Sequence, residues 1–275
     1  MTTIGLFHCS DLHFGHPAVP EQYEAIEALV QERRYDVVAI SGDLTQRARS
    51  GEFQRARAFI KHAERASKVI VVPGNHDVAW WFSPFGMGDD RKLLRKYRQY
   101  INEDIEPVLQ LPGATFVGLN TCHGVIRHTL TWNLRDLSII GYLREEQLTR
   151  AAEEFSATPP DDARVIVMHH NPVKGELSRR HGLRNTNRIL GAFAEMGVDL
   201  VLCGHDHQEA VHYIEHTKKG TIISTAGTIS NRARGGRPSS VNSITITGKS
   251  IDVHTLIWSA EARTFTPGPQ QCFDR

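Results

Sequence analysis

The chain has 275 residues, a formal net charge of +1 with histidine neutral, 40% hydrophobic residues and 23% charged residues. This length fits one large domain or two modest ones, and the near-zero charge argues against a general nucleic-acid or anionic-membrane binder. Four widely separated cysteines without a CxxC pair disfavour a thiolate zinc site and a disulfide framework. Because there is no signal-peptide pattern and no 18-residue apolar run, we expect a cytoplasmic protein without stable membrane insertion.

The first 73 residues alternate between short apolar runs and amphipathic stretches. Strands are predicted over 3–10, 36–41 and 68–73, and helices over 21–34 and 51–66. Such a βαβαβ order predicts parallel strands joined by right-handed crossovers.

Residues 78–110 break this rhythm. The stretch VAWWFSPFGMG is aromatic and rich in turn residues, and a charged helix is predicted over 89–109. We interpret about 78–112 as a cap-like insertion over one edge of the sheet. The α/β pattern then resumes, with strands predicted over 115–120, 163–168 and 199–203 and helices over 143–155 and 186–197.

From residue 210 onward only strands are predicted, in four successive runs that begin at residues 210, 221, 240 and 250. Four strands in succession suggest a largely antiparallel layer. The simplest architecture is one domain over 1–275, with two sheets and helices outside them.

Polar residues follow five of the predicted strands. The segments are Asp11-Leu12-His13, Gly42-Asp43, Gly74-Asn75-His76-Asp77, His169-His170 and Gly204-His205-Asp206-His207. Each segment alone also suits an ordinary turn. Ligands of such sheets collect where the carboxyl ends of parallel strands meet, so five polar strand ends together predict a site.

The predicted donors are two carboxylates, one amide and four imidazoles: Asp11, His13, Asp43, Asn75, His169, His205 and His207. A mixed nitrogen and oxygen set without thiolate suits Zn²⁺, Mn²⁺, Fe or Co. Seven donors suit two ions that share a carboxylate better than they suit one. In an extended GHDH segment, His205 and His207 would both face the ions, and Asp206 would face away.

These blocks, in this order, resemble the calcineurin-like metallophosphoesterase superfamily, whose pattern D-x-H…GD…GNH(D/E)…H…GHxH is matched between residues 11 and 207. The closest resemblance is to small bacterial class III cyclic-nucleotide and glycerophosphodiester phosphodiesterases. The resemblance implies an α/β fold, a four-layer αββα sandwich of two mixed sheets flanked by helices. It also implies a metal site at the strand carboxyl ends, and the all-β tail fits the family's second sheet.

The resemblance further implies which residue holds which ion. Asp11, His13 and His207 would hold the first metal, and Asn75, His169 and His205 the second, with Asp43 bridging. His169 is chosen over its neighbour His170 because it follows the strand directly.

The resemblance also implies the chemistry, in which a metal-bridging hydroxide attacks phosphorus. His76 would protonate the leaving oxygen, and the alternative is a histidine that only orients other groups. Asp77, Asp206 and His170 would fix the ligands. Related protein phosphatases have an aspartate that supports the catalytic histidine, and Gln46 stands at that position here. This departure argues against a protein phosphatase and leaves the support of His76 open.

The predicted function is hydrolysis of a small nucleotide or glycerophosphodiester by an enzyme with two divalent ions, Mn²⁺, Fe²⁺/Fe³⁺ or Zn²⁺. One alternative is a pyrophosphohydrolase of a nucleotide-linked lipid or sugar, which a basic groove beside the insertion would favour. Another is a non-catalytic metal-binding scaffold. The expected partner is the small phosphodiester; no nucleic acid is expected, and a homodimer is left open.

Two groups of residues have open roles. The aromatic residues of the insertion, Trp80, Trp81, Phe82 and Phe85, could stack on a base or seat an acyl chain, or could pin the insertion or form a dimer contact. Several arginines could bind a second phosphate or could be solvated surface residues: Arg47, Arg49, Arg127, Arg232 and Arg234.

Overall fold

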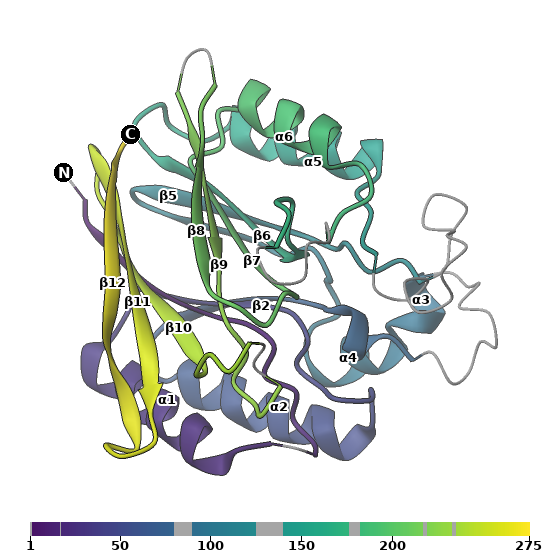
Figure 1. Ribbon diagram of the computed structural model, residues 1–275. Coiled ribbons are helices and arrows are strands. Elements are labelled where there is room, and N and C mark those ends of the chain that lie inside the picture. Colours follow the sequence, from purple (N-terminus) through teal and green to yellow (C-terminus); the bar gives the residue numbers. More distant parts are fainter. Residues whose placement is uncertain are drawn as a thin grey trace.

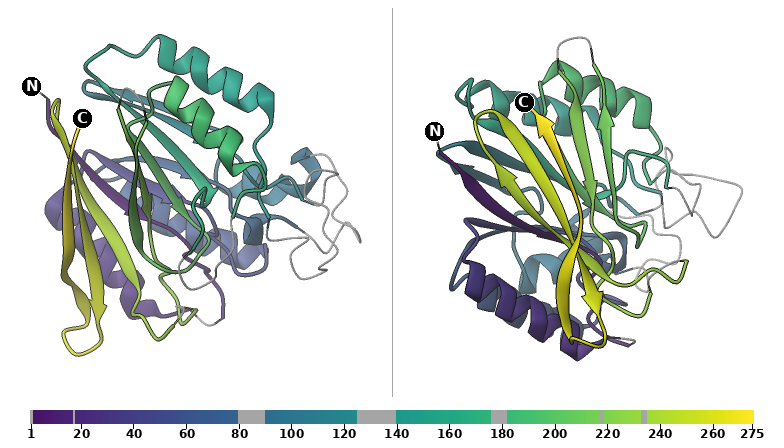
Figure 2. Two further views of the ribbon diagram at one scale, coloured as in Figure 1. Left: turned by 45° about the horizontal axis from the view of Figure 1, so that its top comes forward. Right: turned by 60° about the vertical axis from the view of Figure 1, so that its left-hand side comes forward.

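The computed structural model describes residues 2–16, 18–79, 90–124, 140–175, 182–216, 219–232 and 235–275. Two six-stranded mixed sheets lie face to face, with α1 and α2 outside the first and α5 and α6 outside the second (Figures 1 and 2). The predicted four-layer αββα sandwich is therefore confirmed. No helix in the described ranges has the length and apolarity needed to cross a membrane.

The first sheet has the order β12-β11-β10-β1-β2-β3. Its strands are β1 (Ile4–Cys9), β2 (Val37–Ser41), β3 (Lys68–Val72), β10 (Ser240–Ile246), β11 (Ser250–Ser259) and β12 (Thr264–Asp274). The parallel β1-β2-β3 unit is as predicted, with Phe7 opposite Val38 and Val38 opposite Val69. Helices α1 (Pro20–Arg33) and α2 (Ser50–Ala63) connect its strands.

The second sheet has the order β4-β5-β6-β7-β9-β8. Its strands are β4 (Val108–Leu111), β5 (Ala114–Leu119), β6 (Ala163–His170), β7 (Leu200–Gly204), β8 (Ala210–Ile214) and β9 (Thr221–Thr225). Strands β5, β6, β7 and β9 are parallel. Helices α5 (Glu145–Ser156) and α6 (Thr186–Glu195) cover its outer face.

Three apolar layers hold the sandwich together. One lies between the first sheet and its helices and includes Phe7 and Phe53; the second lies between the sheets and includes Phe116. The third lies beneath α5 and α6 and includes Phe155 and Phe193. The central strands are buried on both faces, which explains why β2 and β7 are continuous apolar runs rather than alternating ones.

The helix predicted over 89–109 is wrong beyond its first half. Short helices α3 (Asp90–Leu93) and α4 (Arg95–Tyr100) are followed by turns and by β4. The side chains of Asn102 and Asp104 accept hydrogen bonds from backbone N–H groups two residues ahead, which competes with helix formation. Pro107 then excludes helical continuation. Tyr97 of α4 is fully buried, so this part of the predicted cap-like insertion packs on the body.

The carboxyl-terminal strands do not form one layer, and the expectation that they all join the second sheet is wrong. The β8–β9 hairpin joins the second sheet through β9, which is parallel to β7. Strands β10 to β12 extend the first sheet through antiparallel pairing of β10 with β1. Strand β12 was not predicted because Pro267 and Pro269 interrupt its pattern; prolines are tolerated at this sheet edge.

Candidate metal centre

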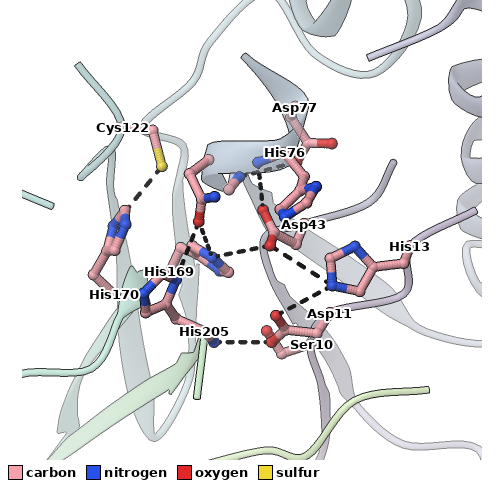
Figure 3. Close-up of polar contacts among 12 residues, drawn as sticks. Ser10, Asp11, His13, Asp43, His76, Asp77, Cys122, His169, His170 and His205 are labelled. Carbon is pink, nitrogen blue, oxygen red and sulfur yellow. Dashed lines mark hydrogen bonds and ion pairs between the residues drawn. The ribbon is translucent and has the colours of Figure 1, made fainter. Parts of the chain in front are cut away.

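The ends of β1, β2, β3, β6 and β7 meet at one edge of the sandwich and bring all seven predicted donors together. Asp11, His13, Asp43, His169 and His205 can be followed in Figure 3. Asp11 and His13 follow β1, Asp43 follows β2, and Asn75 lies in the short 3-10 helix η1 (Asn75–Asp77) after β3. His169 is the penultimate residue of β6, which runs past its predicted end at residue 168, so His169 lies in the strand rather than directly after it; His205 and His207 follow β7. The side chains come from segments up to about 200 residues apart, so only the parallel topology can assemble them.

One group of donors is formed by Asp11, His13 and His207. Asp11 Oδ1 lies 3.1 Å from His207 Nε2 and 3.7 Å from His13 Nε2, and the two histidine Nε2 atoms are 3.1 Å apart. Asp11 and His13 are fully buried, and His207 is 7% exposed. Three donor atoms therefore face one small volume.

The second group is formed by Asn75, His169 and His205. Asn75 Oδ1 lies 3.1 Å from His169 Nε2 and 3.1 Å from His205 Nδ1. His205 thus presents Nδ1 to this group, whereas His169 presents Nε2.

Asp43 lies between the two groups. Its Oδ2 atom is 3.8 Å from His13 Nε2 in the first group and 3.4 Å from His169 Nε2 in the second. Its Oδ1 atom accepts a hydrogen bond from the backbone N–H of His76 at 2.8 Å. One carboxylate therefore contacts both donor groups while the 3-10 helix holds it in position.

The hydrogen bonds of two histidines show that these donors fit a cation. His207 Nδ1 donates to the Arg232 carbonyl at 3.1 Å, and His169 Nδ1 donates to the Ser41 carbonyl at 2.8 Å. In each neutral ring the Nε2 lone pair therefore faces other acceptors, the Asp11 carboxylate for His207 and the Asp43 carboxylate for His169. A lone pair and a carboxylate that face each other repel, and a cation between them, or a proton on the ring, removes this repulsion.

The pKa shifts agree with this interpretation. Although burial acts to raise the pKa values of Asp11 and Asp43, the surrounding histidines hold both well below the usual range, so both side chains are anionic. Burial lowers the pKa of His169, but Asp43 raises it, and the result is a pKa of about 9. Where no cation is bound, a proton on His169 can occupy its place.

Left-handed backbone conformations place most of these donors. Among the described non-glycine residues eight have a positive φ, and five of these are predicted ligands: Asp11 (54°), His13 (48°), Asp43 (51°), His205 (72°) and His207 (55°). Such conformations cost about 1–3 kcal/mol each and concentrate at functional sites. The GHDH segment is thus bent rather than extended. Both of its histidines reach the site as predicted, but strand alternation is the wrong reason.

Motif glycines let the strand-end loops approach one another. A Cβ atom at Gly74 would lie 2.1 Å from the Asp43 backbone nitrogen, and a Cβ atom at Gly204 would lie 2.3 Å from Asp11 Oδ2. No side chain fits at either distance. The glycines of GNHD and GHDH therefore serve packing between the donor loops.

His76 faces the first donor group from η1. Its ring lies 4.8 Å from the His13 ring, centroid to centroid. Its Nδ1 donates to the backbone carbonyl of Gln46 at 2.8 Å, which leaves Nε2 toward the site. The support that the sequence left open is thus a main-chain carbonyl rather than a carboxylate. Asp77 faces away and accepts hydrogen bonds from the backbone of Gly74, Leu44 and Thr45, which fastens the β3 loop to the β2 loop.

Two residues beside the site had no assigned ligand role. His170 Nδ1 lies 2.6 Å from Thr121 Oγ1, and its ring lies 4.5 Å from that of His205, so it borders the second group. The Arg232 side chain reaches the first group from the loop before β10. The sequence named Arg232 only as one arginine among five, and nothing local distinguished it from the others.

Two of the other residues with open roles lie among the described residues. Arg47 and Arg49 are exposed. Trp80, Trp81, Phe82, Phe85, Arg127 and Arg234 lie outside the described residues.

The chain belongs to the calcineurin-like phosphoesterase family, whose model matches residues 5–209. This family comprises phosphoric ester hydrolases that use divalent metals, and the Asp and His cluster described above could bind a metal. No match to a curated protein sequence was found.

Several solved structures share the fold. Purple acid phosphatase PPD1 from yellow lupin (Lupinus luteus) seeds has a TM-score of 0.71 and 11% identity, over 100% of this chain and 54% of that one. The chain therefore spans about half the length of the lupin protein. TT1561 of Thermus thermophilus has a TM-score of 0.55 and 15% identity, over 97% and 99%. GAP50, the anchor in the inner membrane complex of Plasmodium, has a TM-score of 0.55 and 12% identity, over 93% of this chain and 84% of that one. These identities establish similarity of fold alone.

Proposed function

We propose that the protein is a phosphodiesterase with two divalent metal ions, Mn²⁺, Fe²⁺/Fe³⁺ or Zn²⁺, acting on a small nucleotide or a glycerophosphodiester. The observation that carries the proposal is the position of Asp43, whose Oδ2 atom contacts both donor groups. Asp11, His13 and His207 would hold one ion, Asn75, His169 and His205 the other, and Asp43 would bridge. When bound, such ions supply a nucleophile activated from water and neutralise charge on the phosphoryl oxygens.

His76 is the proposed general acid. Its Nδ1–H bond to the Gln46 carbonyl fixes the ring and directs Nε2 toward the site, where a proton could pass to the leaving oxygen. The competing role, orientation of Asp43 alone, uses the backbone N–H of His76 and does not need the imidazole.

Two substitutions separate these roles. Asn75→Ala should lose the second ion, because Asn75 Oδ1 faces both histidines of that group. His76→Ala should keep both ions, since its backbone N–H still reaches Asp43, and should lose mainly the rate for poor leaving groups by about 10²–10⁴-fold. Metal content and kcat for leaving groups of graded pKa measure both effects. Loss of both ions in His76→Ala would contradict the assignment.

A panel of substrates tests the proposed activity. Mn²⁺-loaded protein is assayed with bis-p-nitrophenyl phosphate, p-nitrophenyl phosphate, cyclic nucleotides, glycerophosphodiesters and nucleoside diphosphate esters. The monoester belongs in the panel because the lupin structure is named a phosphatase. Two bound ions without turnover of any diester or diphosphate would refute the proposal.

One observation favours a pyrophosphohydrolase as the second candidate. A pocket of about 220 Å³ within the insertion is lined by Lys92, Arg95 and Lys96 together with Ala79, which lies three residues after His76 in the sequence. Three basic side chains around one pocket suit a substrate with more than one phosphate. Turnover of a nucleoside diphosphate ester well above that of simple diesters would support this candidate.

The alternative outside the enzyme class is a non-catalytic metal-binding scaffold. It is retained because GAP50, which shares the fold, is described as an anchor. The complete donor set and the directed His76 ring argue for catalysis, because a scaffold needs no proton donor for a leaving group. The substrate panel decides between the two.

A further inference from the structure

Arg232 belongs to a loop that is fastened to the first donor group. Thr228 Oγ1 donates to the Asp11 carbonyl at 2.9 Å, and the Ile229 N–H donates to the same carbonyl at 3.2 Å. The Arg232 carbonyl accepts the Nδ1–H bond of His207 at 3.1 Å. Because these contacts use the main chain and Thr228, the loop position does not depend on the arginine side chain.

The guanidinium group of Arg232 points into the site. Its Nη1 atom lies 3.2 Å from His76 Nε2, 3.4 Å from Gln46 Oε1 and 3.4 Å from His13 Nδ1. Within the described ranges no carboxylate forms an ion pair with it. A partly buried guanidinium without a carboxylate partner among the described residues gains when an anionic oxygen replaces one of its present partners, because opposite charges add Coulomb attraction to the hydrogen bond.

The charges around Arg232 indicate what that anion is. If the donors hold two divalent ions, as proposed above, two carboxylates leave the site with a net positive charge, to which Arg232 adds. A simple phosphodiester carries one negative charge and leaves the site positive. A phosphate with a second ionised oxygen, or a second phosphate beside the scissile one, supplies the missing negative charge.

We propose that Arg232 is a specificity-determining residue that binds a second anionic oxygen of the substrate, and that the preferred substrate carries a second negative charge at or next to the scissile phosphate. This inference rests on the two-ion site of the proposed function. It favours a phosphomonoester, or the diphosphate ester of the pyrophosphohydrolase candidate, over singly charged diesters. The position of Nη1 between His76 and His13 places that oxygen beside the proposed general acid.

The test compares Arg232→Ala and Arg232→Lys with the wild type and with Arg57→Ala. Arg57 is an exposed arginine of α2. Its substitution also removes one positive charge from the protein, but from the surface of this helix rather than from the site, and so serves as the control. Mn²⁺ stoichiometry and the affinity for inorganic phosphate are measured by calorimetry. The kcat/KM values are measured for bis-p-nitrophenyl phosphate, p-nitrophenyl phosphate and UDP-glucose.

Arg232→Ala is expected to keep both ions and to bind phosphate about 10- to 100-fold more weakly, with an intermediate loss in Arg232→Lys and none in Arg57→Ala. The preference for at least one doubly charged substrate over bis-p-nitrophenyl phosphate should fall by a similar factor. A fall confined to p-nitrophenyl phosphate assigns the second charge to the scissile phosphate, and a fall with UDP-glucose assigns it to the neighbouring one.

Unchanged phosphate affinity and unchanged substrate preference in Arg232→Ala would overturn the inference. Loss of metal in that variant would also overturn it, because Arg232 would then be part of the metal site itself. A wild type without any turnover would refute the proposed function instead, and the comparison of phosphate affinities would still decide the role of Arg232.

Discussion

Replacing Gly204 by alanine tests the packing of the candidate metal centre. The added Cβ atom would lie 1.8 Å from Ser10 Oγ and 2.3 Å from Asp11 Oδ2. Asp11 must then move by about 1 Å to regain ordinary contact distance. That movement breaks the hydrogen bond of 2.9 Å that the His205 N–H donates to Asp11 Oδ2.

The expected cost follows from these two effects. Overpacking of a close contact costs about 1–3 kcal/mol, and loss of a hydrogen bond to a charged group costs about 1.5–3 kcal/mol. Gly204→Ala should therefore lower the free energy of unfolding by about 2.5–6 kcal/mol. Because Asp11 is a proposed ligand, the variant should also bind its first Mn²⁺ ion at least about 10-fold more weakly.

Gly191→Ala is the matched control. Gly191 lies in α6, and a Cβ atom there would meet nothing within 4 Å. The same chemical change should stabilise the protein by about 0.5–1 kcal/mol through helix propensity. Urea unfolding with EDTA measures stability, and calorimetric titration with Mn²⁺ measures affinity. If Gly204→Ala matched the control in both measurements, the proposed packing between the β7 and β1 loops would be wrong.

Two further predictions concern histidines. Burial lowers the pKa of His8 to about 3, so below pH 6.5 the unfolded chain binds a proton that the folded protein does not, and stability falls as pH falls toward 3. When the pH is lowered from 6.5 to 5 in EDTA, the free energy of unfolding of His8→Asn should therefore fall by about 2 kcal/mol less than that of the wild type. Urea unfolding at the two pH values measures this difference, and an equal fall in both proteins would contradict the prediction. His169→Ala should bind one Mn²⁺ ion instead of two, because His169 Nε2 faces Asp43 and Asn75, whereas His170→Ala should keep both. The reverse result in metal analysis would assign the ligand role to His170.

The sequence predicted the site better than it predicted the outer parts of the fold. Asp11, Asp43 and His169 could be located because each lies within two residues of the end of an apolar strand, and parallel strands end at one edge. The charged stretch over 89–109 was misread as one helix, since local turn bonds at Asn102 and Asp104 outweigh its helix propensity. The sheet to which β10 belongs depends on pairing with β1, more than 200 residues away, and no local pattern encodes that choice.

The sequence alone indicated the kind of chemistry, because the seven donors lie at the ends of five strands and their residue types limit what they can bind. The tertiary structure alone decided how the donors are shared. It put Asp43 between two groups, bent the GHDH segment through positive φ angles, and gave His76 a backbone carbonyl instead of a carboxylate. It also brought Arg232 to His76 across 156 positions of chain. Contacts of this kind depend on how loops from different strands pack together, and that packing has no signature in any one segment.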